Sequence, residues 1–178
     1  MKKGLRRKKL CKRKKGKIVK VEYLYLDLNT CERCMGTDKV LEDVLKNIET
    51  AFKIAGYTLI YKKVEIENAE IAKEYRFISS PTIRVNGKDI CESVEENNCS
   101  SCGDIARTQV NCRTYSYGGK VYEVPPKEMI AEAILKIAFE PQVSCYCQEE
   151  YVLPENLKNF FEGKETKKCK NTCSSGCC

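Results

Sequence analysis

Histidine is absent from the 178 residues of this chain. Histidine-based metal sites and Cys–His nucleophiles are therefore excluded. The sequence also lacks a Gly-rich loop that could cradle phosphate, a Ser–His arrangement and paired catalytic carboxylates. What it has instead is 13 cysteines, an odd number that cannot all pair within one chain. The chemistry of this protein is therefore expected to be the chemistry of thiols.

Long apolar runs are also absent. No stretch approaches the roughly 20 apolar residues that span a bilayer, and the basic N-terminus is not followed by the apolar segment of a secretory signal. We expect a cytoplasmic protein without a membrane span. In that compartment thiols stay reduced, so a cysteine-rich chain points to redox or metal chemistry rather than to a disulfide scaffold.

Positive charge is concentrated at the N-terminus. Twelve of the 32 basic residues lie within residues 1–20, which contain no acid, so the remainder of the chain is net acidic. Residues 1–17 have no hydrophobic periodicity and are predicted to be a disordered basic arm. No base-reading element accompanies it, so any contact of residues 2–17 with nucleic acid would be weak and non-specific.

Hydrophobic periodicity predicts one α/β domain over residues 18–139. The expected elements in chain order are a buried strand (18–28), a helix (38–55), a strand (57–66), a short helix (69–75), a hairpin turning at Asn86-Gly87, a second hairpin turning at Gly118-Gly119 and a helix opened by Pro125-Pro126. A β-α-β crossover followed by a hairpin and a closing helix gives a mixed four-stranded sheet with helices on both faces. Residues 91–112 are a cysteine-rich insertion. Residues 140–178 are a cysteine-rich tail, in which 153–161 is expected to be a docking helix.

Cys31 and Cys34 form a C-x-x-C motif where the first strand gives way to the first long helix. Both thiols are within disulfide reach, and the positive end of the helix favours a thiolate at the first cysteine. The spacing suits either a dithiol redox centre or a clamp for a soft metal ion.

Together with Ser80-Pro81-Thr82, which precedes the predicted third strand, this motif resembles the thioredoxin-like superfamily. The likeness is to glutaredoxin-like members and a cysteine-rich prokaryotic branch, and it spans about residues 18–139. Two departures are visible, since Thr30 replaces the usual aromatic residue and Glu-Arg replaces the usual Gly-Pro or Pro-Tyr.

The resemblance implies roles for these residues. Cys31 would be the attacking thiolate and Cys34 the resolving thiol, with Pro81 in a cis peptide beside them. A protein or low-molecular-weight thiol or disulfide partner would be bound by the residues around the motif, which are Thr30, Arg33, Ser80 and Thr82.

The other cysteines suggest a second kind of site. Cys99 and Cys102 form a C-x-x-C pair, and with Cys91 and Cys112 they could hold zinc or an iron–sulfur cluster, or pair as disulfides. The tail thiols are spaced to bind soft ions or metalloids; they are Cys145, Cys147, Cys169, Cys173, Cys177 and Cys178.

Two functions follow as expectations. The first is thiol-disulfide exchange by Cys31 and Cys34, with the additional thiols as relay or soft-metal ligands. The alternative is a protein that binds thiophilic metals or metalloids, as a chaperone or store, without redox catalysis.

Overall fold

The computed structural model describes residues 17–91, 93–140 and 150–172, with side chains through residue 166. The basic arm and the tail cysteines Cys145, Cys147, Cys173, Cys177 and Cys178 lie outside these ranges, as does the side chain of Cys169. Within the described ranges, no helix has the length and apolar character needed to cross a membrane.

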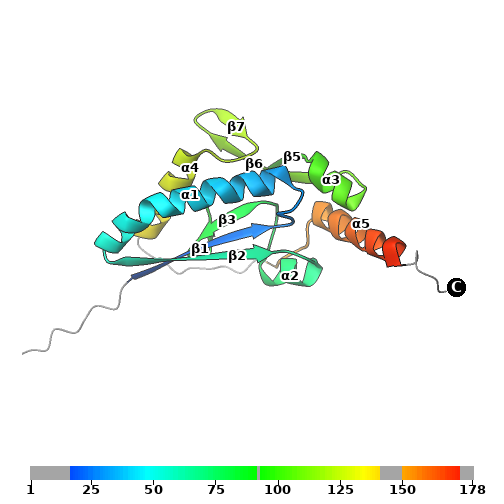
Figure 1. Cartoon of the computed structure of the whole chain (residues 1–178), viewed down its shortest axis with the longest axis horizontal. Coiled ribbons are helices and arrows are strands. Elements are labelled where there is room, and N and C mark those ends of the chain that lie inside the picture. Colours follow the sequence, from blue (N-terminus) through cyan, green and yellow to red (C-terminus); the bar gives the residue numbers. More distant parts are fainter. Residues whose placement is uncertain (1–16, 92, 141–149, 173–178) are drawn as a thin grey trace, which may run out of the picture.

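A four-stranded mixed sheet forms the centre of the molecule (Figure 1). Its strands are β1 (Lys17–Tyr25), β2 (Tyr57–Glu65), β3 (Thr82–Val85) and β4 (Lys88–Asp89). Their order across the sheet is β2-β1-β3-β4. β1 pairs in parallel with β2, whereas β3 runs antiparallel to β1 and β4 antiparallel to β3. The predicted α/β class and the mixed four-stranded sheet are confirmed.

Helices cover the sheet in two groups. On one face, α1 (Glu32–Ile54) and α4 (Lys127–Phe139) pack over Val19, Val21 and Tyr23 of β1. These alternate residues point to one side because successive side chains of a strand alternate between faces. Leu24 points the other way, into a second apolar cluster that includes Ala72 of α2 (Ala69–Glu74). The central strand is therefore buried on both sides where it approaches the C-x-x-C motif.

Glycine and asparagine form the turns after α1 and between β3 and β4. Gly56, at φ +80°, ends α1 in the left-handed conformation that residues other than glycine adopt less readily. Asn86 and Gly87 both have positive φ, which is the geometry of the tight turn that joins β3 to β4. Both features were predicted. α1 differs from the prediction in one respect, because it begins at Glu32 rather than near Asp38, with Cys31 as its N-cap residue.

The cysteine-rich insertion and the hairpin that turns at Gly118-Gly119 form a second, three-stranded sheet in the order β5-β6-β7. Its strands are β5 (Glu95–Asn98), β6 (Asn111–Tyr117) and β7 (Lys120–Tyr122), and the short helix α3 (Ser100–Ala106) lies between the first two. β6 is attached to the segment around the cis peptide Ser80–Pro81, because the Arg113 amide donates to the Ser80 carbonyl and the Tyr115 hydroxyl donates to the Pro81 carbonyl. The sequence did not predict β5 or α3.

The final helix, α5 (Glu155–Thr172), lies against the insertion (Figure 1). Its Leu157, Phe160 and Phe161 are buried in the second apolar cluster, as expected for a docking helix. The approach to α3 is so close that a Cβ atom on Gly163 would meet the Ala106 carbonyl oxygen at 2.0 Å. Only glycine therefore fits at this crossing.

Candidate metal centre

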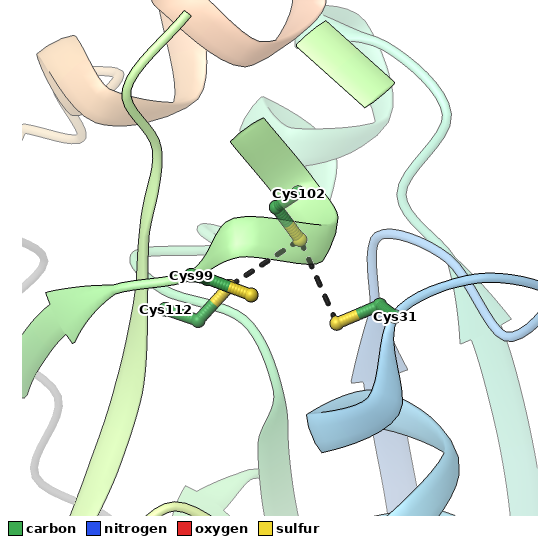
Figure 2. A group of neighbouring side chains, drawn as sticks. All are labelled: Cys31, Cys99, Cys102 and Cys112. Atoms are coloured by element: carbon green, nitrogen blue, oxygen red, sulfur yellow. Dashed lines mark hydrogen bonds between the residues drawn. The ribbon is translucent and has the colours of Figure 1, made fainter. Parts of the chain in front are cut away.

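Four cysteines from three parts of the chain meet where β1 ends (Figure 2). Cys31 comes from the start of α1, Cys99 and Cys102 from the start of α3, and Cys112 from β6. Their sulfur atoms all lie within 4.8 Å of one another, and all four side chains are buried. Cys102 is central, because its Sγ lies 3.6 Å from that of Cys31 and 3.4 Å from that of Cys112.

The backbone around Cys31 is shaped by Asp27, a residue that the sequence analysis did not single out. Its Oδ1 accepts hydrogen bonds from the amides of Asn29, Thr30 and Cys31 and from the Thr30 hydroxyl. Partial burial raises the pKa of Asp27, but the hydrogen bonds from Thr30, Cys31 and Asn29 outweigh it and the pKa is lowered. An ionised carboxylate thus organises the loop that delivers Cys31. The only signal in the sequence is an aspartate shortly before Thr30, a spacing typical of such loops.

Cys34 lies outside the group of four. It is fully buried, and its Sγ lies 3.3 Å from the Ser80 hydroxyl oxygen, which also accepts a hydrogen bond from the Leu26 amide. Cys34 follows Cys31, the N-cap residue, in the first turn of α1. Cys31 is therefore shared between the C-x-x-C pair and the group of four.

Charge is unevenly distributed over these thiols. Hydrogen bonds from Cys102 and Cys112 lower the pKa of Cys31, and those from the same two cysteines lower the pKa of Cys99 to about 7. The hydrogen bond with Cys31, together with burial, raises the pKa of Cys34. The pKa of Cys112 is raised by its hydrogen bond with Cys102. The protonation of each of these thiols therefore depends on its neighbours in the group.

Cys91 lies apart from the cluster. It is half-buried, and burial raises its pKa to about 11. Its amide donates to Asp89, which also holds the buried Arg113 through two 2.8 Å contacts. The structure thus brings together three of the four insertion cysteines considered from the sequence, with Cys31 in the place of Cys91.

The residues expected to bind a substrate differ in their exposure to solvent. Thr30 is exposed, but Ser80 and Thr82 are buried, and the Thr82 hydroxyl donates to the Ser79 carbonyl. Cys31 itself is buried beneath the insertion. In this conformation the C-x-x-C motif faces the other thiols of the chain rather than solvent.

Arg33, between the two cysteines of the motif, links α1 to the insertion. Its guanidinium donates to the backbone carbonyls of Asn97, Asn98 and Cys112, and it pairs with Glu123 at 2.5 Å. The arginine is only 7% exposed. It therefore keeps the strand that carries Cys112 in position next to Cys31.

Replacing Arg33 with alanine is expected to lower the free energy of unfolding by about 2–4 kcal/mol, because one buried and two part-buried carbonyls lose their charged donor. The free energy of unfolding of Arg33→Lys should lie between those of Arg33→Ala and wild type, since a single ammonium group cannot donate to several carbonyls as the planar guanidinium does. Glu123→Gln is the matched control. The Glu123 side chain is 58% exposed, so its ion pair should contribute less than about 1 kcal/mol. Urea unfolding followed by circular dichroism would measure all three, and equal losses for Arg33→Ala and Glu123→Gln would contradict this role.

Comparison with known proteins identifies one family. The family described as "Domain of unknown function (DUF2703)" matches residues 19–134, which include all four clustered cysteines and Cys34. No curated protein and no solved structure matches the chain. With about two thirds of its length matched, the chain belongs to the DUF2703 family.

Proposed function

We propose that this protein binds a soft metal ion, with zinc as the reference, through Cys31, Cys99, Cys102 and Cys112. The observation that carries the proposal is that four buried sulfurs lie within 4.8 Å of one another. Zinc–sulfur bonds of about 2.3 Å in a tetrahedron place the sulfurs about 3.8 Å apart. The 3.4 and 3.6 Å separations around Cys102 are close to that value.

The spacing favours a single ion over an iron–sulfur cluster, because a cluster inserts iron and sulfide atoms between the cysteine sulfurs and needs a wider cage. Four thiolates also complete a tetrahedral coordination shell. No position is left for a substrate, so the site is suited to holding an ion rather than to metal-assisted hydrolysis. This supports a structural, storage or delivery role for zinc or another thiophilic ion.

The test is the metal content of the full-length chain, purified anaerobically and titrated with zinc. We expect one tightly bound zinc per chain and tetrahedral four-sulfur coordination by X-ray absorption spectroscopy. Cobalt(II) added to the metal-free protein should give the intense visible bands of a tetrahedral tetrathiolate, and zinc should then displace the cobalt and abolish them. Failure to bind zinc tightly, or a coordination shell containing oxygen, would overturn the proposal.

Dithiol exchange by Cys31 and Cys34 is a second candidate, favoured by one observation. Cys31 is the N-cap residue of a 23-residue helix and Cys34 follows in its first turn, which is the placement that an attacking and a resolving thiol need. The chain order and the strand order support a thioredoxin-like scaffold for this chemistry, with a protein or small thiol as partner. A Cys31→Ser variant as active as wild type in reducing a small disulfide would remove this candidate.

A further inference from the structure

Two C-x-x-C motifs face each other across the cluster. The inner pair is Cys31 and Cys34 at the start of α1, and the outer pair is Cys99 and Cys102 at the start of α3. Each motif has its first cysteine at the N-cap of its helix. The sulfurs of Cys31 and Cys102 lie 3.6 Å apart, so these atoms can bond after a small movement.

The two pairs differ in their surroundings. Cys99 is buried but 3% exposed, and it lines a surface groove together with Asn98, Ser100 and Gly103, whereas Cys102 is fully buried. Cys31 and Cys34 are fully buried. A small disulfide would therefore approach the two pairs from the groove beside Cys99.

We propose that, in the metal-free protein, Cys99 and Cys102 pass oxidising equivalents to Cys31 and Cys34 through a transient Cys31–Cys102 disulfide. The inference builds on the dithiol candidate, because it names the partner of the inner pair, and it does not require metal binding. An ion held by four sulfurs would occupy Cys31, Cys99 and Cys102 and so would block the exchange.

The exchange balances in four steps. The Cys99 thiolate attacks a small disulfide and releases one thiolate, and Cys102 then attacks the Cys99 sulfur and releases the second. The small disulfide has gained two electrons and takes up the protons of the outer pair. Cys31 next attacks the Cys102 sulfur and frees Cys99. Finally Cys34 attacks the Cys31 sulfur and frees Cys102, and the protons of the inner pair pass to Cys99 and Cys102.

Oxidised glutathione added to metal-free, full-length wild type provides the first test. Acid quenching, alkylation and mass spectrometry would follow the disulfides with time. We expect the Cys99–Cys102 bond to appear first and then decay as the Cys31–Cys34 bond forms. In a Cys99→Ala/Cys102→Ala variant, oxidation of the inner pair should slow on the order of tenfold or more, because access limits exchange.

A trapping variant provides the second test. Cys34→Ser/Cys99→Ser lacks both thiols that resolve the intermediate, so oxidation should accumulate the Cys31–Cys102 disulfide. The control Cys34→Ser/Cys91→Ser retains Cys99, which would reverse that bond, and should accumulate Cys99–Cys102 instead.

Each outcome has a distinct meaning. A Cys102–Cys112 disulfide as the main product of the trapping variant would overturn the relay, as would inner-pair oxidation at an unchanged rate without Cys99 and Cys102. In both cases an intact Cys31–Cys34 disulfide in wild type would leave the dithiol candidate standing. If Cys31 and Cys34 never pair in wild type, both ideas fail.

Discussion

Replacing Cys102 with serine is expected to weaken zinc binding by roughly a hundred- to a thousandfold. Structural zinc sites have apparent binding free energies of about 10–16 kcal/mol, so each of four ligands accounts for about 2.5–4 kcal/mol. A hydroxyl is a poor ligand for a soft ion, and Cys102 is the cysteine whose sulfur lies closest to two others. Competition with a chromophoric zinc chelator under anaerobic conditions would measure the change.

Cys91→Ser is the matched control for that experiment. The substitution is the same and the residue belongs to the same insertion, but Cys91 lies outside the group of four. We expect its zinc affinity to stay within about threefold of wild type. Equal weakening in the two variants would contradict the assignment of ligands, and so would a Cys102→Ser variant that binds zinc as tightly as wild type.

Removing the metal is expected to loosen one half of the molecule and leave the other intact. The second apolar cluster combines the four thiols with Ala106 of α3 and Leu157 and Phe160 of α5. The first cluster lies between the main sheet, α1 and α4, and contains no cysteine. An ion at a thousand times its dissociation constant stabilises the state that binds it by about 4 kcal/mol. That stabilisation should be confined to the elements that close around the ion.

Hydrogen exchange measured by mass spectrometry on zinc-loaded and zinc-free protein would test this prediction. Amides of α3 and the first turns of α5 should exchange on the order of a hundredfold faster without zinc. β1, β3 and α4 provide the internal control and should change by less than about threefold. Uniform acceleration over both clusters, or none, would contradict the prediction.

Much of the main sheet could be predicted from local sequence. The run of β-branched and aromatic residues in β1, the helical spacing in α1 and α4, and the Asn86-Gly87 turn are short-range signals that tertiary packing did not override. β5 and α3 were not predicted because their sequences are polar and lack hydrophobic periodicity. Every residue of β5 is exposed. These elements are held by hydrogen bonds with β6 and by the thiol cluster, and neither can be read from nearby residues.

Which cysteines form the candidate metal centre was predicted only in part. The Cys99-x-x-Cys102 spacing indicated two members of the group, and Cys112 was grouped with them because it is near in the chain. Cys31 lies 71 residues from Cys102, and their contact depends on how the insertion folds back over α1. Arg33, from the same motif, holds that arrangement through three carbonyls. Proximity in the sequence therefore favoured Cys91 as the fourth member of the group, whereas in the folded structure the fourth member is Cys31.

The Gly163–Ala106 crossing has a consequence for how the C-terminal segment can vary. A helix that touches its neighbour backbone to backbone cannot slide by one residue, since any other side chain of α5 would then strike the Ala106 carbonyl. The register of α5 on α3 is thus fixed by Gly163, which has a hydrogen atom where alanine has a methyl group. The part of α5 around Gly163 is consequently held at one fixed position beside α3, the helix whose N-cap residue and first turn provide Cys99 and Cys102.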